Sequence, residues 1–98
     1  MKIVTVVKDA AYRDKLEKLL RKLRQEYKSA GTASGGQEGY RLIKEEVPDL
    51  IIADISLPRT DGLLMLKKVR KEKIYSKVIL IAEKEDFLID LESYKKSL

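Results

Sequence analysis

The residue best placed to do chemistry is Asp54, which follows the apolar residues 50–53. A short and almost continuous apolar run predicts a strand that is buried on both faces, as in a parallel sheet covered by helices. The carboxyl ends of such strands open into a ligand crevice, so a carboxylate at this position is expected at a binding site rather than in the core. Carboxylates also end strands for purely structural reasons, and the position alone leaves both interpretations open.

Composition limits the kinds of chemistry that are available. The chain has no Cys and no His, which excludes disulfides and thiolate metal sites and removes the commonest metal ligand and general base. Hydrolase triads and zinc centres are therefore excluded. The 98 residues, 44% of them hydrophobic and 38% charged, predict one soluble globular domain. No apolar run approaches the roughly 20 residues of a membrane helix, and no signal-peptide pattern follows Met1, so a cytoplasmic location is expected.

The net charge of +5 raises the question of an anionic partner. The basic residues do not form one tract, because in residues 15–24 and 67–73 they alternate with apolar residues at helical spacing. Solvated helix faces explain this pattern better than a nucleic-acid surface does. Binding to nucleic acid or to another anionic surface remains a third hypothesis.

Four stretches of the sequence predict strands, namely residues 3–7, 28–34, 49–54 and 78–82. Helices are predicted between and after them. The first helix begins after Asp9, and the residues expected to face inward are Leu16, Leu19, Leu20, Leu23 and Tyr27. The second helix covers residues 37–46, with Tyr40, Leu42 and Ile43 facing inward. The third helix carries the apolar residues Leu63, Leu66 and Val69, and the last helix covers residues 85–97. This alternation predicts an α/β domain with a parallel sheet, right-handed crossovers and helices on both faces.

Two adjoining segments give the chain a family resemblance. They are Pro-Asp-Leu-Ile-Ile-x-Asp-Ile over residues 48–55 and Leu-Pro-x-x-Asp-Gly over 57–62, which includes Pro58 and Gly62. With the order of elements, they make residues 2–98 resemble the receiver domain of two-component response regulators. The resemblance implies a flavodoxin-like (CheY-like) doubly wound parallel sheet of four βα units with strand order 2-1-3-4. Residues 1–98 would form a single receiver-like domain that ends before the family's fifth strand and helix.

The resemblance implies a regulatory module of a phosphorelay rather than an enzyme with its own substrate. Asp54 would be the phosphoacceptor, and a histidine kinase or another signalling protein would be the partner. In the family a bound Mg²⁺ neutralises charge on the attacking carboxylate and the transferring oxygens. An acidic pair after the first strand holds that metal through its carboxylate oxygens.

This sequence departs from the family at the positions that surround Asp54. Ungapped alignment of the first helix puts Val7 and Lys8 at the two acidic positions, and only a one-residue slip would bring Asp9 onto the second of them. The family's hydroxyl residue at the end of the fourth strand falls on Ala82. If Mg²⁺ binds at all, its carboxylate ligands would be Asp9 and Asp54. Lys8 could form an ion pair with Asp54 or extend into solvent, and phosphorylation is expected to be impaired.

A second hypothesis assigns the chain to a different class, a phosphorylation-independent pseudo-receiver that acts in protein interaction or oligomerisation. Without a fifth strand, residues 78–82 would form an exposed apolar edge of the sheet, which is prone to association. The edge could pair with another copy of the chain, or the chain could be a truncated fragment. The sequence leaves these two possibilities open.

Overall fold

The computed structural model describes residues 1–23, 26–58 and 60–82. Its elements, in chain order, are β1 (Lys2–Val6), α1 (Ala10–Leu23), β2 (Lys28–Ala33), α2 (Gly36–Glu46), β3 (Leu50–Asp54), α3 (Gly62–Lys71) and β4 (Lys77–Ile81). The four predicted strands and the first three predicted helices are confirmed, and the ends of the strands and of the second helix differ by one residue at most. The first helix was predicted to include Tyr27, but α1 ends at Leu23 and Tyr27 lies outside it. The helix predicted over 85–97 lies outside the described residues.

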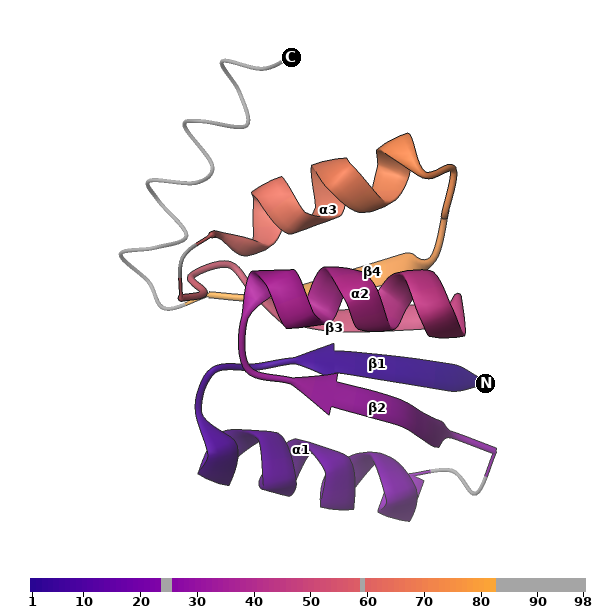
Figure 1. Ribbon diagram of the computed structural model, residues 1–98. Helices are drawn as coiled ribbons and strands as arrows, with labels where there is room; N and C mark the ends of the chain where they lie inside the picture. Colours follow the sequence, from indigo (N-terminus) through magenta and orange to yellow (C-terminus); the bar gives the residue numbers. More distant parts are fainter. Residues whose placement is uncertain (24–25, 59, 83–98) are drawn as a thin grey trace.

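The strands form one parallel sheet in the order β2-β1-β3-β4. Figure 1 shows α1 on one face of this sheet and α2 and α3 together on the other. The chain therefore has the doubly wound, flavodoxin-like arrangement that the resemblance implied. No helix of the described segments is long and apolar enough to cross a membrane.

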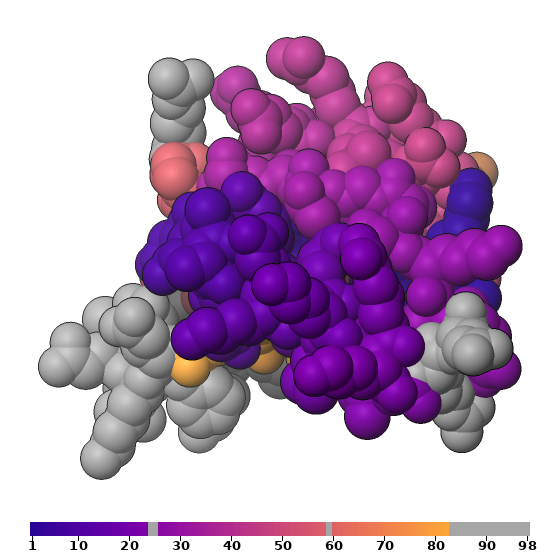
Figure 2. Space-filling view, turned by 90° about the horizontal axis from the view of Figure 1, so that it is seen from below, coloured from indigo at the N-terminus to yellow at the C-terminus, as the bar shows by residue number. Residues whose placement is uncertain are grey.

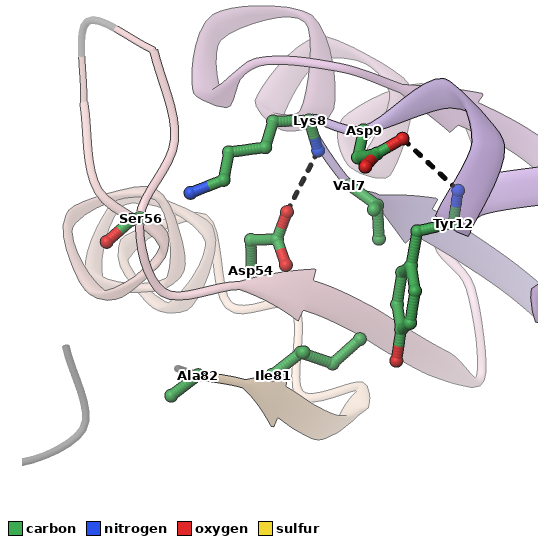
Figure 3. Close-up of a pocket in the computed structure, with 8 residues that line it drawn as sticks. All are labelled: Val7, Lys8, Asp9, Tyr12, Asp54, Ser56, Ile81 and Ala82. Atoms are coloured by element: carbon green, nitrogen blue, oxygen red, sulfur yellow. Dashed lines mark hydrogen bonds between the residues drawn. The ribbon is translucent and has the colours of Figure 1, made fainter. Parts of the chain in front are cut away.

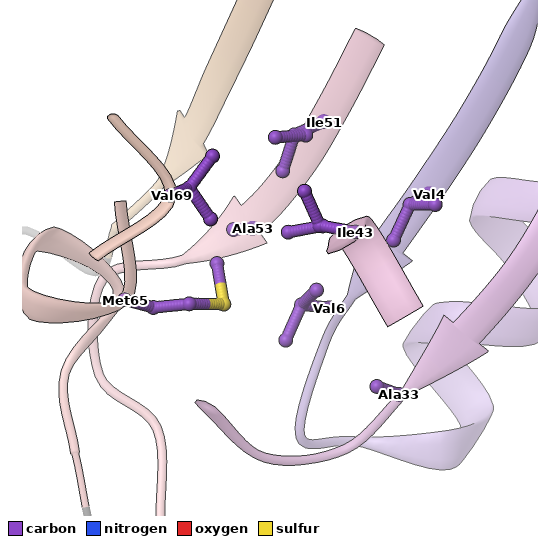
Figure 4. Packing of buried hydrophobic residues seen from close by; sticks show 8 residues of the cluster. All are labelled: Val4, Val6, Ala33, Ile43, Ile51, Ala53, Met65 and Val69. Carbon is purple, nitrogen blue, oxygen red and sulfur yellow. The ribbon is translucent and has the colours of Figure 1, made fainter. Parts of the chain in front are cut away.

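The main core lies between the sheet and the pair of helices α2 and α3 (Figure 4). Alternate side chains of the central strands point into it, because successive residues of a strand face opposite sides of the sheet. Its buried members are Val4, Val6, Ala33, Ile43, Ile51, Ala53, Met65 and Val69. The intervening residues Ile3, Thr5 and Ile52 are also buried. Burial on both faces explains why β1 and β3 are nearly continuous apolar runs.

The predictions for individual inward-facing residues were only partly right. In α1, Leu19 and Leu23 are 53% and 61% exposed, and only Leu16 and Leu20 are half-buried. Periodicity identifies an apolar stripe, but it does not say which part of a broad stripe meets the sheet. In α3 the prediction missed Met65, which is fully buried.

A cluster of polar side chains joins α2 to α3 at the surface. The Tyr40 hydroxyl donates a 2.7 Å hydrogen bond to Glu72 Oε1, and Lys44 Nζ lies 3.6 Å from the same oxygen. The hydrogen bond from Tyr40 and the charge of Lys44 lower the pKa of Glu72, and the bond to Glu72 raises the pKa of Tyr40. Because the carboxyl pKa is lowered in the folded state, the stabilisation is present at neutral pH and is lost as the pH falls through that lowered pKa.

The residue that ends α2 carries a strain that substitution should relieve. Val47 has φ 43° and ψ 66°, in the left-handed region, and its side chain is 58% exposed. A β-branched residue in this conformation costs about 1–2 kcal/mol, whereas glycine adopts it freely. We expect Val47→Gly to raise the free energy of unfolding by about 0.5–1 kcal/mol, because the gain is partly offset by the greater freedom of unfolded glycine. Urea denaturation measures the change. Val47→Ala is the control, since it keeps the Cβ; an equal gain there would contradict the explanation.

Candidate functional site

The candidate site lies where the carboxyl ends of three neighbouring strands meet. Asp54 is the last residue of β3 and pairs with Ile81 of β4, while Lys8 and Asp9 follow β1 and Ala82 follows β4. Parallel pairing brings these ends to one edge of the sheet, where they surround a cavity of about 250 Å³ (Figure 3). Its lining residues are Val7, Lys8, Asp9, Tyr12, Asp54, Ser56, Ile81 and Ala82. The structure thus brings together four residues that the sequence singled out.

The Asp54 carboxylate is held by the main chain that follows β1. Asp54 is only 9% exposed, and its Oδ2 accepts a 2.9 Å hydrogen bond from the main-chain N–H of Lys8. Its Oδ1 accepts no hydrogen bond from the described residues. Because every buried side-chain polar atom among these residues has a hydrogen-bond partner, Oδ1 is not a buried atom and must be open to the cavity. A carboxylate that is fixed through one oxygen and open through the other can act as a nucleophile or as a ligand for a cation.

The Lys8 side chain does not form the ion pair with Asp54 that was one of the two hypotheses. Lys8 is exposed, and Figure 3 shows its side chain running past Asp54 toward Ser56. No ion pair within 4.0 Å joins the two residues in the described part of the chain. The contact between them is made by the Lys8 main chain, and the ammonium extends into solvent at the mouth of the cavity.

Asp9 is committed to the start of α1. Its Oδ1 accepts hydrogen bonds from the main-chain N–H groups of Ala11 and Tyr12, at 2.9 and 3.3 Å. These bonds satisfy N–H groups that have no partner within the helix, so Asp9 is the N-cap of α1. A carboxylate engaged in this way is poorly placed to turn toward a metal beside Asp54.

The donor set does not fit the Mg²⁺ that the family uses. Mg²⁺ requires several oxygen ligands in near-octahedral geometry. Val7 brings carbon to the cavity and Lys8 brings a positive charge. In the described segments no group of three or more acidic, His or Cys residues is placed to hold a metal ion.

The loop after β3 places α3 directly against Asp54. The N–H of Gly62 donates a 2.6 Å hydrogen bond to the carbonyl oxygen of Ile55, and a Cβ at position 62 would overlap the main-chain carbonyl oxygen of Asp54. Asp61 caps α3, because its Oδ1 accepts a 2.6 Å bond from the N–H of Leu64. Pro58 is exposed and does not line the cavity. The Asp-Gly pair of the sequence therefore marks a close approach of two main-chain segments.

Sequence reasoning did not single out Tyr12, Ser56 or Ile81 as site residues. Tyr12 lies three residues after the cap Asp9, so its place in the first turn of α1 was a usable signal. Ser56 lies two residues after Asp54, in the loop that must leave the carboxyl edge. Ile81 precedes Ala82 and pairs with Asp54 across the sheet, and that pairing could be known only from the strand order.

A doubly wound sheet of order 2-1-3-4 with a carboxylate held at the end of its third strand defines a flavodoxin-like domain with a candidate ligand site at its carboxyl edge. Residues 3–95 match the family model of the response regulator receiver domain. The chain is 33% identical over 93 residues to the transcriptional regulatory protein AfsQ1 of Streptomyces coelicolor. The aligned region covers 93% of this chain and 40% of that protein. The chain belongs to the receiver domains of two-component response regulators.

Solved structures agree with this assignment. The N-terminal domain of an uncharacterized protein from Wolinella succinogenes is 32% identical in sequence to this chain and superposes with a TM-score of 0.76. The superposed region covers 94% of this chain and 73% of that domain's chain. The REC domain of AraT, a response regulator from Geobacillus stearothermophilus, is 21% identical with a TM-score of 0.84 and covers 96% and 73%, which shows the shared fold. The chain spans less than half the length of the curated relatives that it matches.

The contact between Gly62 and Asp54 predicts a large effect of one added methyl group. Gly62→Ala should lower the free energy of unfolding by about 2–3 kcal/mol, because either the loop or the start of α3 must move away from the Asp54 carbonyl. Denaturant unfolding measures the loss. The matched control is Gly35→Ala, where the new Cβ would lie 4.0 Å from its nearest neighbour, Pro58 O, and φ is −144°. We expect the control to cost less than about 1 kcal/mol, mainly as a poorer helix cap; equal losses would contradict the steric argument.

Proposed function

We propose that this chain is a phosphorelay signalling module in which Asp54 occupies the phosphoacceptor position and phosphotransfer is impaired. It would act by changing its contacts with other proteins, not as an enzyme on a substrate of its own. Its partner would be a histidine kinase or another signalling protein of the cytoplasm. Family membership and the position of Asp54 at the cavity support the phosphoacceptor assignment.

The observation that carries the proposed impairment is the mismatch between Asp54 and its surroundings. Transfer to Asp54 would form a bond from a carboxylate oxygen to phosphorus while the bond from phosphorus to the donor's leaving group breaks, a histidine nitrogen in a kinase or a carboxylate oxygen in acetyl phosphate. Negative charge on the carboxylate and on the phosphoryl oxygens must be neutralised during this step. In the ungapped alignment Val7 and Lys8 stand where the family has its acidic pair, and Asp9, which a one-residue slip would bring there, is engaged as a helix cap. The Ala82 methyl group offers no hydroxyl to a phosphoryl oxygen.

The alternative function is that of a pseudo-receiver, which works through protein contacts without phosphorylation. The exposed apolar residues of β4 favour it, since Ile79 is 51% exposed and Leu80 is 36% exposed. Nucleic-acid binding ranks third, because the basic residues of α1 are spread along its solvent side. A strong salt dependence of binding to a polyanion would be the mark of that function.

Phosphodonor reactivity separates the first two functions. We expect intact mass spectrometry after incubation with acetyl phosphate and Mg²⁺ to show little or no gain of a phosphoryl group, because the described residues around Asp54 do not supply the oxygen ligands that would hold a cation beside it. Asp54→Asn is the control, since it removes the accepting carboxylate and keeps the shape of the side chain. A stoichiometric gain that disappears in the control would prove Asp54 a competent phosphoacceptor and contradict the proposed impairment.

A single substitution should move the site toward metal binding. Lys8→Asp removes a positive charge from the cavity mouth and adds a carboxylate beside Asp54, at an exposed position where folding should tolerate it. We expect Mg²⁺ affinity, measured by isothermal titration calorimetry, to rise at least about tenfold. Lys8→Ala is the matched control, because it removes the charge without adding a ligand. If Lys8→Asp gains no more affinity than Lys8→Ala, the acidic position does not limit metal binding.

A further inference from the structure

The outer surface of the α2–α3 pair carries charged side chains that the proposed phosphoryl site does not use. We infer that this surface binds an acidic amphipathic helix of a partner protein, whose carboxylates would face basic residues of both α2 and α3. The surface, called the basic face below, consists of Arg41, Lys44, Lys68 and Lys71 with the apolar residue Leu64. The inference concerns a second contact surface, and it does not depend on whether Asp54 accepts a phosphoryl group.

Contacts between α2 and α3 show which side of each helix forms the basic face. Figure 1 places both helices on the same face of the sheet. The Tyr40 hydroxyl of α2 donates a 2.7 Å hydrogen bond to Glu72 at the end of α3, and Lys44 Nζ lies 3.6 Å from the same carboxylate oxygen. Glu72 follows Lys68 by four residues, which is about one helical turn, so Lys68 also lies on the side of α3 that faces α2.

The basic residues form two short rows, one on each helix. Arg41 and Lys44 are three residues apart on α2, and Lys68 and Lys71 are three residues apart on α3, so the members of each row lie on neighbouring positions of one helix side. All four side chains are exposed. The two rows therefore flank the line along which α2 meets α3.

Most of this positive charge is not balanced within the described part of the chain. Lys44 is paired with Glu72, but no carboxylate oxygen of the described residues lies within 4.0 Å of the charged group of Arg41, Lys68 or Lys71. Like charges three residues apart on a helix repel each other. An anionic partner would relieve this repulsion, and complementary charge of this kind steers association and fixes its register.

The helix dipole accounts for only part of this arrangement. It favours basic residues in the last turn of a helix, where Lys44, Lys68 and Lys71 lie, but it does not favour one side of the helix over another. α2 also contains three acidic residues, and one of them, Glu46, is engaged with Lys2 of β1 at 3.2 Å. The side of α2 that contacts α3 is left with the basic residues, so the face as a whole is positive.

Spacing and apolar character favour an acidic helix as the occupant. Residues three apart on a helix are separated by about 4.5 Å along its axis, so carboxylates three residues apart on a partner helix match each basic row. Alternate residues of an extended strand are roughly 6.6 Å apart and fit the rows less well. Leu64, which lies one turn before Lys68 and is 49% exposed, offers an apolar contact that an amphipathic helix uses and a bare polyanion such as nucleic acid does not.

The basic face lies toward the end of the helices that is far from Asp54. Both α2 and α3 begin near the carboxyl edge of the sheet and run back toward its other edge (Figure 1). Lys44 is in the last turn of α2, and Lys68 and Lys71 are in the last turn of α3. A helix bound here would leave the Asp54 cavity open, so partner binding and phosphorylation can be measured separately.

Binding of a designed peptide tests the inference. The probe is a fluorescein-labelled helical peptide of about 18 residues, with Glu at three- and four-residue spacing on both sides of a stripe of Leu. Fluorescence anisotropy should show that the double variant Lys68→Gln, Lys71→Gln binds it at least about tenfold more weakly, because one basic row is lost. The matched control is Lys15→Gln, Lys18→Gln, which removes two exposed lysines at the same spacing from α1, the helix in the middle of the face seen in Figure 2. The control should weaken binding by less than about twofold.

The remaining comparisons separate an acidic helix from other anions. A scrambled peptide of the same composition and a single-stranded DNA of the same charge should each bind at least about tenfold more weakly than the designed peptide. Circular dichroism confirms that each variant is folded. Equal losses in the two double variants would show that binding follows net charge, and equal affinity for the DNA or the scrambled peptide would show a general polyanion surface. Either result, or no binding of the designed peptide at concentrations up to about 1 mM, where association is worth roughly 4 kcal/mol, would overturn the inference.

Discussion

The carbonyl group at the end of β3 and the first residue of α3 approach each other so closely that a side chain at position 62 has no room. This contact sets the path of the whole loop that leaves the carboxyl edge. It fixes where α3 starts, and through α3 it fixes Met65 and Val69 in the core. It also leaves the Asp54 side chain directed at the cavity, where the main-chain N–H of Lys8 holds one of its oxygens.

The geometry of the site and its chemistry come from different parts of the molecule. The cavity is built by main-chain relations, namely parallel pairing of β1, β3 and β4 and the turn at Gly62. The chemistry depends on side chains at a few positions around that frame. Val7 contributes carbon atoms to the cavity and Lys8 contributes a positive charge. A receiver fold can therefore hold a carboxylate at this edge among side chains that do not suit a divalent cation.

Much of this could be read from the sequence, because the relevant signals are local. The apolar runs, the cap at Asp9 and the Asp-Gly pair predict the order of elements and the class of fold. They also point to Asp54 as the site carboxylate, since a strand end followed by a turn is visible in the chain itself. The exposure of Leu19 and Leu23 was not predictable in this way, because an apolar stripe at helical spacing does not reveal how much of it the sheet covers.

The tertiary structure alone decided which residues meet at the cavity and what each of them does there. Lys8 binds Asp54 through its main chain and not through its ammonium, and this depends on how β1 ends relative to β3. Ile81 and Tyr12 join the site because β4 and the first turn of α1 lie beside that end. Such relations join residues far apart along the chain, so their geometry is set by strand order and register. The sequence determined the elements and the candidate carboxylate, and packing of those elements determined the site.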